Sequence, residues 1–340
     1  ALSNGICPAY GEIDPYAMAW AAIDEAIRNL VAIGADPDQV AILDNFCWGN
    51  PNLPDRLGTL VRCAQGCYDA AVTFNTPFVS GKDSLNNEYT GADGQKHAIL
   101  GTLLISATGI VPNADKTVTM DLKPDADLLY IVGDTRPELG GSHFGLINEW
   151  QDGRVPAPVP DAPVRFRTLF QAISADLIRA CHDLSEGGLA VALAEMALAG
   201  QIGAEVSLSA VPTNGQSLAD TERLYAESLS RFLVQIKSEN AAEFESLLSQ
   251  NNVPFGQIGR TGGPTLTILN QQNAPLFTYP ISQLEQSWRS HTQPTKRQMA
   301  NGKWQAQSLT TNRPITQSPT TQFTIHNSQF TIHHPPSPLF

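Results

Sequence analysis

The chain has 340 residues, of which 42% are hydrophobic and 16% charged; this is enough for two domains of ordinary size and excludes disorder throughout. The formal net charge of −12 argues against a nucleic-acid partner, because binding a duplex requires several cations against its phosphates. No apolar run is long enough to span a membrane and no leader sequence opens the chain, so we expect a cytoplasmic protein without a membrane partner.

The first half of the chain alternates predicted helices and strands. Asp14 is a good N-cap and Pro15 suits the first helical position, so a helix is predicted from these residues to Gly34. Periodicity and turn residues then predict a strand at 39–44, a helix at 57–74, a polar loop at 81–95 and a strand at 98–111.

A second unit is predicted to begin near Lys123, after a segment with closely spaced prolines and aspartates. Its predicted elements are a helix ending near Ala180, a helix at 189–200, and strands at 127–133, 231–236, 255–259 and 265–269. Because helices and strands alternate in both halves, the expected fold class is α/β (α+β), with an amino-terminal sheet domain at 1–122 and an α/β domain at 123–287.

Residues 288–340 differ in composition from the rest of the chain. They contain no Asp or Glu and five Lys or Arg, and the motif QFTIHN at 322–327 returns as QFTIHH at 329–334. A histidine-rich metal-binding tract is one interpretation. We favour a disordered low-complexity tail, because a segment without a packed apolar face does not offset its chain entropy.

The five cysteines are odd in number and irregularly spaced, which argues against a disulfide framework. Cys63 and Cys67 lie four residues apart on a predicted helix. A structural zinc site needs four ligands at set spacings, so buried reduced thiols are the expected state of this pair.

Glu25 and Asn29 form the first group of residues that suggests chemistry. Their spacing of four residues places a carboxylate and an amide oxygen on one helix face, which suits a hard cation such as Mg²⁺. Such pairs are usually solvated, but the apolar neighbours Ala22, Ala26 and Ile33 strengthen the metal interpretation.

The second group combines Asp44, at the end of one predicted strand, with the segment SGKDS (80–84) at the end of another. Ligand sites in α/β sheets gather at the carboxyl ends of strands. Gly81 would let backbone amides approach a phosphate, Lys82 would supply a cation and Ser84 a hydroxyl. The spacing of a Walker A loop is absent, and the segment taken alone is equally compatible with an ordinary turn.

The third group is CHDLSEGG (181–188), directly before a predicted helix. Asp183 or Ser185 would cap that helix, whose free N-terminal amides would suit an anion. A Ser-His-Asp triad is not expected from neighbours on one loop. Helix capping alone explains the residues of this segment about as well as a functional role does.

Taken together, these segments resemble one family, formylglycinamidine ribonucleotide synthase, an ATP-dependent ligase of purine biosynthesis. The segments that carry the resemblance occur in the family's order and include ILDNFCWGNP (42–51), FVSGKDSLNNEY (78–89), GDTRPELGGSHF (133–144), CHDLSEGGLAVALAEMALAG (181–200) and ESLSRFLVQI (227–236). The chain resembles the carboxyl-terminal half of the synthetase portion. The resemblance implies a sheet domain like that of aminoimidazole ribonucleotide synthetase, followed by an α/β domain.

The implied reaction converts formylglycinamide ribonucleotide and ammonia from glutamine into formylglycinamidine ribonucleotide, with ATP and Mg²⁺ as cofactors. By match of motif, the implied sites are ATP at Asp44, Gly81, Lys82 and Ser185, substrate at Ser84, and Mg²⁺ at Glu25, Asn29 and Asp183. Lys82 departs from the small-subunit members, which carry a magnesium-binding Asn at this position.

The resemblance also implies two partners: the amino-terminal synthetase half, which holds the family's catalytic histidines, and a glutaminase subunit or domain. The chain begins without Met and contains neither, so we expect a fragment that is inactive alone, and we assign it no catalytic residue. Two alternatives remain open. One is an enzyme like aminoimidazole ribonucleotide synthetase, against which DNFCWGNP and GKDS argue, and the other is a structural half that holds ADP without turnover.

Overall fold

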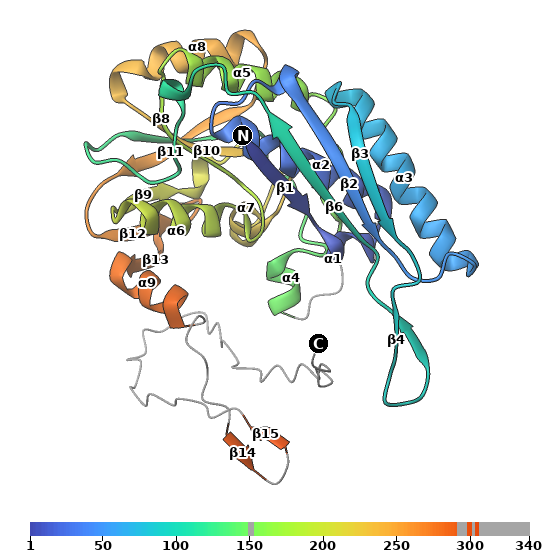
Figure 1. Ribbon diagram of the computed structural model, residues 1–340. Coiled ribbons are helices and arrows are strands. Elements are labelled where there is room, and N and C mark those ends of the chain that lie inside the picture. The colour runs from blue at the N-terminus through green and yellow to red at the C-terminus, as the bar shows by residue number, and fades with distance from the viewer. Residues whose placement is uncertain (149–152, 291–297, 301–302, 306–340) are drawn as a thin grey trace. The chain divides into compact units, whose positions relative to one another are not determined.

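The structure is a computed structural model that describes residues 1–148, 153–290, 298–300 and 303–305 (Figure 1). Residues 1–290 form one compact unit, and residues 291–340 form another. In the second unit, β14 (Gln298–Ala300) and β15 (Lys303–Gln305) pair antiparallel. The remainder of the predicted tail beyond Ser290, including its near-repeat and its histidines, lies outside the described residues.

Helix α2 (Pro15–Ala32) is the centre of the first unit. Its N-terminus is capped as predicted, because the Asp14 side chain accepts a hydrogen bond from the backbone N–H of Tyr16 at 3.0 Å. From Ala17 onward nearly every residue is buried, since the helix contacts β1, β6 and α3 as well as β8 and α5. A helix that is apolar almost all round is one enclosed on all sides.

A four-stranded sheet with the order β1-β6-β2-β3 covers one side of α2. Its strands are β1 (Leu2–Ile6), β2 (Val40–Cys47), β3 (Phe78–Ser84) and β6 (Thr102–Gly109). The β2–β3 pair is parallel and is connected through α3 (Pro54–Phe74), whereas β6 runs antiparallel to both β1 and β2. Alternate residues of β6, from Leu103 to Ala107, face the core.

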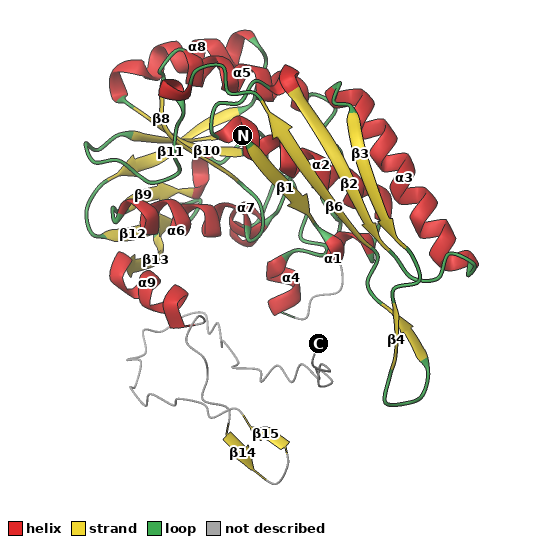
Figure 2. Ribbon diagram, in the orientation of Figure 1, coloured by secondary structure: helices red, strands yellow, loops and turns green. Residues whose placement is uncertain are grey.

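The polar loop predicted at 81–95 is wrong. Gly81–Ser84 belong to β3, and β4 (Glu88–Thr90) and β5 (Lys96–Ala98) form a projecting hairpin beyond it (Figure 2). The prediction failed because β3 is an edge strand whose side chains are almost all exposed. Its residues are held by backbone pairing to β2, so the strand carries no apolar alternation.

A seven-stranded sheet with the order β13-β12-β9-β11-β7-β10-β8 follows. Its strands are β7 (Leu128–Val132), β8 (Ile178–Asp183), β9 (Ala204–Ser207), β10 (Phe232–Ile236), β11 (Phe255–Thr261), β12 (Thr265–Leu269) and β13 (Pro275–Pro280). Only the β9–β12 pair within this sheet is parallel among the described strands. The predicted strands at 127–133, 231–236, 255–259 and 265–269 are confirmed, whereas β9 and β13 were missed.

The remaining helices are α1 (Pro8–Gly11), α4 (His143–Ile147), α5 (Ala162–Ser174), α6 (Gly188–Gly200), α7 (Asp220–Tyr225), α8 (Ala241–Gln250) and α9 (Ile281–Ser290). The helix predicted to end near Ala180 instead ends at Ser174 and gives way to β8. Asp176, with φ of 59°, makes the turn. Helix α9 continues past residue 288, the predicted start of the tail. No helix in the described part of the chain is long and apolar enough to cross a membrane.

The two sheets share one core. Leu128, Tyr130 and Val132 of β7 belong to the same hydrophobic cluster as α2 and β6, whereas Leu129 and Ile131 face a second cluster with α6. Aromatic rings continue the shared cluster. The ring centroid of Phe74 of α3 lies 6.0 Å from that of Trp20 of α2 and 5.6 Å from that of Phe166 of α5. The ring centroids of Phe166 and Phe232 of β10 are 5.6 Å apart. The boundary predicted at residue 122 falls in the connection between β6 and β7 and remains a prediction.

Candidate functional site

The predicted site residues lie in two places. One set is on the parallel pair β2–β3, and the other surrounds the point where α2 meets the end of β8. The structure therefore joins the first and third groups of the sequence prediction and leaves the second apart.

On the first sheet, Asp44 and Gly81 face each other across the parallel pair. Asp44 is half-buried and lies within β2, not at its end as predicted, because the strand continues to Cys47. A Cβ atom on residue 81 would collide with the Asp44 carboxylate, so only glycine fits here with that carboxylate in place. Asp44 also pairs with Ile105, a fully buried residue, which places the carboxylate on the core-facing side.

Lys82 and Ser84 form the other pair of this segment. The Lys82 ammonium donates a hydrogen bond to the Ser84 hydroxyl, and both residues alternate with Gly81 along β3. Successive side chains of a strand point to opposite faces. The structure thus separates the predicted ATP and substrate contacts into two pairs, Asp44 with Gly81 and Lys82 with Ser84, on opposite faces of the parallel β2–β3 pair.

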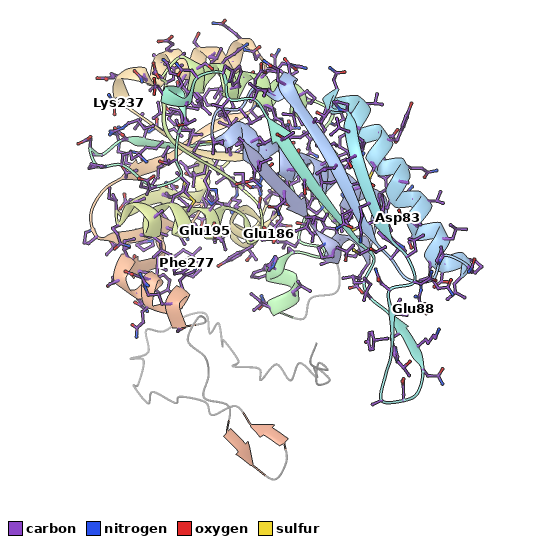
Figure 3. All side chains as sticks on the ribbon, viewed as in Figure 1. Asp83, Glu88, Glu186, Glu195, Lys237 and Phe277 are labelled. Carbon is purple, nitrogen blue, oxygen red and sulfur yellow. The ribbon has the colours of Figure 1, made fainter. Side chains whose placement is uncertain are left out.

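Glu88 is a residue of this region that the sequence prediction missed. Its side chain is largely buried, accepts a hydrogen bond from the Asn50 backbone N–H at 3.2 Å and lies 3.8 Å from the Arg56 guanidinium. Glu88 begins the hairpin that leaves the sheet beside Asp83 (Figure 3). It therefore joins the turn after β2 to the segment after β3, which fixes the carboxyl ends of both strands.

At the second place, the Arg28 guanidinium occupies the space between α2 and the end of β8. Its Nη1 donates to Asp24, its Nη2 donates to the Ser185 hydroxyl at 2.8 Å, and its Nε lies 3.6 Å from Asp183 Oδ2. Arg28, Asp24 and Asp183 side chains are 3%, 1% and 7% exposed. A buried arginine thus lies where the sequence predicts a metal ion.

Glu25 and Asn29 are engaged by β1 and the turn after it. Glu25 Oε2 accepts hydrogen bonds from the Ile6 backbone N–H at 2.9 Å and from Cys7 Sγ at 3.4 Å, and Asn29 donates to the Asn4 carbonyl at 3.4 Å. Burial raises the pKa of Glu25 to about 7, although the nearby Arg28 charge opposes this rise. The Glu25 carboxylate therefore lies in an environment that disfavours its charge.

These contacts do not fit a divalent cation held by Glu25, Asn29 and Asp183. A hard cation needs several oxygen ligands at about 2.0–2.6 Å around one point. Here the guanidinium fills the space beside Asp183. Across residues 1–148 and 153–290, no group of three or more His, Cys, Asp or Glu side chains is placed to hold a metal ion. In this arrangement other groups engage all three side chains, and the predicted magnesium site stays a prediction.

The loop after β8 differs from the predicted cap. Helix α6 begins after Gly187, with φ of 75°, and no side chain caps it, so neither Asp183 nor Ser185 is the N-cap. Ser185 donates to the Asp183 carboxylate instead. His182 lies 3.2 Å from Asp183 and 2.9 Å from Glu195 of α6. Burial opposes its charge, but these two carboxylates raise the pKa of His182 to about 9.

Glu227 is a further buried carboxylate near this loop, and the sequence prediction gave it no role. It accepts hydrogen bonds from the Tyr10 hydroxyl at 2.5 Å, the His143 backbone N–H at 2.9 Å and the Gly187 backbone N–H at 2.8 Å. It thereby fixes α1 and the starts of α4 and α6. The available signal was ESLSRF, a segment already noted for its resemblance.

The family follows from the sequence itself. Residues 3–111 match the N-terminal domain of the AIR synthase related proteins, and residues 126–268 match their C-terminal domain. The chain belongs to this family. It is similar to phosphoribosylformylglycinamidine synthase subunit PurL of Azorhizobium caulinodans, with 34% identity over 290 residues, which are 85% of this chain and 38% of that protein. The chain thus spans about two fifths of the curated relative, and the predicted resemblance is confirmed.

Solved structures show the same fold. Thermotoga maritima PurL complexed with FGAR has a TM-score of 0.68 at 18% identity, covering 84% of this chain and 45% of that one. The complex of T. maritima PurL with ATP gives 0.65 at 19% identity, and PurLQS from the same organism gives 0.67 at 18% identity, each covering 84% of this chain and 44% of the other. The predicted fold class is confirmed.

Proposed function

We propose that this chain is the carboxyl-terminal synthetase half of a phosphoribosylformylglycinamidine synthase, an ATP-dependent, cytoplasmic ligase of purine biosynthesis. The similarity to PurL over 85% of the chain supports the assignment. In the proposed reaction the γ-phosphoryl group of ATP passes to the amide oxygen of formylglycinamide ribonucleotide. Ammonia then adds to the activated carbon and displaces inorganic phosphate, which leaves formylglycinamidine ribonucleotide and ADP.

The nucleotide contact is proposed at Asp44 and Gly81 on one face of the β2–β3 pair and at Lys82 on the other face, and the substrate contact at Ser84 beside Lys82. The observation that carries this proposal is the register of β2 and β3, which sets the Asp44 carboxylate over a residue without a side chain. Transfer of a phosphoryl group depends mainly on positioning and on fixed charges, and Lys82 supplies a cation at the edge strand. Ser185, half-buried and bonded to Arg28, is the proposed nucleotide contact of the second place.

Magnesium would enter with the nucleotide and neutralise its phosphate charge. No magnesium ligand of the chain is proposed, because the contacts of Glu25, Asn29 and Asp183 do not fit the ion. The chain's own residues would hold the nucleotide phosphates through backbone N–H groups and the Lys82 ammonium.

Two partners are proposed: the amino-terminal synthetase half and a glutaminase. The relatives are longer than this chain, and one of the solved T. maritima structures is named PurLQS. Helices α2 and α3 lie on one side of the four-stranded sheet (Figure 1), and its strands expose apolar side chains, among them Leu2 at 85%, Leu43 at 38% and Val79 at 63%. Exposed apolar surface of this kind supports an interaction with another chain segment.

The proposed function is tested by reconstitution. ATP and ADP binding to the full chain would be measured by calorimetry, and amidine formation with ammonium would be followed with and without the amino-terminal half of a PurL relative. We expect nucleotide binding by the chain and turnover only in the mixture. Turnover by the chain alone would contradict the proposal, and binding without turnover in the mixture would favour the structural, ADP-holding alternative.

Gly81→Ala is expected to weaken nucleotide binding by roughly tenfold, which corresponds to about 1.4 kcal/mol. The new Cβ atom would force the Asp44 carboxylate away from the strand and obstruct the backbone. Calorimetric titration of ATP measures the effect. Gly58→Ala is the matched control, because residue 58 lies on exposed α3 with nothing within 4 Å of the new atom. Equal affinities of the two variants would contradict the proposed contact.

A further inference from the structure

We propose that Arg28 is a built-in replacement for a divalent cation: its guanidinium, in place of a metal ion, balances the buried carboxylates of Asp24 and Asp183 and fastens α2 to the end of β8. The inference concerns the second place alone and does not depend on the proposed function. It is carried by the burial of three charged side chains and by the directions of the arginine's contacts.

Burial makes a counter-charge necessary. The side chains of Asp24 and Asp183 are 1% and 7% exposed, and Arg28 between them is 3% exposed. A carboxylate removed from water persists in its charged form only when it is paired with a cation or well hydrogen-bonded. Asp183 also has His182 at 3.2 Å, and Arg28 is the cation that Asp183 shares with Asp24. Glu25 on the same helix adds a third acidic side chain beside Arg28.

The guanidinium reaches these groups in different directions at once. Nη1 donates to Asp24, Nη2 donates to the Ser185 hydroxyl at 2.8 Å, and Nε faces Asp183 at 3.6 Å without a hydrogen bond of its own. A planar group with five donors serves several oxygen atoms around one centre, which is what a coordinated metal ion does. Of the three predicted metal ligands, Asp183 faces the arginine, whereas Glu25 Oε2 accepts from the Ile6 backbone N–H and Asn29 donates to the Asn4 carbonyl.

The contacts also join segments that are far apart in the chain. Asp24 accepts further hydrogen bonds from the backbone N–H of Ser230 at 3.0 Å and from its hydroxyl, while Ser185 lies 157 positions from Arg28. The Arg28–Asp24 pair therefore connects the central helix with two loops of the second sheet: Arg28 reaches Ser185, and Asp24 reaches Ser230. A metal ion added to this place would have to displace a side chain that is itself holding the fold.

The first test needs no variant. Mn²⁺ binding to the full wild-type chain would be followed by electron paramagnetic resonance, and thermal unfolding would be recorded with EDTA and with millimolar Mg²⁺. We expect no bound Mn²⁺ that depends on Asp183 and no change of Tm between the two conditions. One tightly bound Mn²⁺ per chain that disappears in Asp183→Asn would overturn the proposal.

The second test removes the cation. Arg28→Met keeps the length of the side chain without its charge and is expected to lower Tm by roughly 5–10 °C, with partial recovery in millimolar Mg²⁺ or Mn²⁺ because the carboxylates become free to ligate. Arg62→Met is the matched control, since Arg62 pairs with Asp14 at the surface and is 54% exposed. Equal Tm values for the two variants, or a fall in Arg28→Met that neither ion reverses, would contradict the replacement. Arg28→Lys, which keeps a charge, serves if Arg28→Met does not fold, and a Tm close to that of wild type without added metal is expected of it.

Discussion

Asp134→Asn is expected to lower the free energy of unfolding by about 3–5 kcal/mol, because it breaks a buried ion pair by removing one partner. Asp134 follows β7, and its carboxylate lies 2.6 Å from Arg165 Nη2 of α5 and 2.9 Å from Arg136 Nε. The side chains of Asp134 and Arg165 are both 3% exposed. Urea denaturation of the full chain measures the loss.

The control for this prediction uses the same guanidinium. Asp161 lies 2.9 Å from Arg165 Nε but is 51% exposed, so Asp161→Asn is expected to cost at most about 1 kcal/mol. If Asp134→Asn and Asp161→Asn lowered the free energy of unfolding equally, burial of the ion pair would not determine how much it stabilises the fold. A change of the denaturant slope in either variant would require a comparison of midpoints alone.

The stability conferred by Asp134 should also depend on pH. Burial raises the pKa of this carboxyl, but Arg165 and Arg136 outweigh burial and hold the pKa below its ordinary value. A lowered folded-state pKa means that the contribution is fully present above the unfolded value of about 3.9 and is lost as the pH falls through the folded value. The difference between wild type and Asp134→Asn is therefore expected to shrink below about pH 4. A stability difference between wild type and Asp134→Asn that grew as the pH fell would contradict the lowered pKa of Asp134.

Glu227→Ala is the second change with a large expected effect. It leaves three donors without their acceptor: the Tyr10 hydroxyl and the backbone N–H groups of His143 and Gly187. The Glu227 side chain is 1% exposed, and each buried unsatisfied donor costs about 1–3 kcal/mol, so the free energy of unfolding should fall by about 3–5 kcal/mol. Chemical denaturation, with hydrogen exchange at Gly187, measures the loss and its location.

Two further variants make this prediction specific. Glu227→Gln keeps an oxygen for the two backbone donors and is expected to lose less than half as much as the alanine variant. Glu239→Ala removes a side chain that is 74% exposed and has a long ion pair with Lys237, so almost no change is expected. A Glu227→Ala protein as stable as Glu239→Ala would rule out the proposed role of this carboxylate.

The parts of the fold that could be predicted carry strong local signals. Asp14 and Pro15 mark the start of α2, and the charge-free run at 98–111 contains β6. The edge strand β3 was missed because backbone pairing alone holds it. The junction of α5 and β8 was missed for another reason. The chain turns at Asp176, whose backbone is in the left-handed region, and no glycine or proline marks this turn in the sequence.

The candidate site shows a similar division. The proximity of Asp44 and Gly81 was predictable because both follow apolar runs in the sequence. Their register depends on the irregularity between Ile42 and Leu43, which leaves no mark in the sequence. Arg28 was overlooked because arginines are ordinarily exposed. Its partner Ser185 is so distant in the chain that only the packing of α2 against the second sheet reveals the contact.

The enclosed position of α2 has a consequence for how this chain folds. The two family segments, 3–111 and 126–268, are separate in sequence, yet the ring series from Trp20 to Phe232 crosses from one to the other. Residues of both segments build the shared hydrophobic cluster, although a second cluster is formed by residues 122–281 alone. We therefore expect residues 1–290 to unfold in a single thermal transition. A chain cut between the two segments is expected to give two fragments with exposed apolar surface, which fold fully only when they associate.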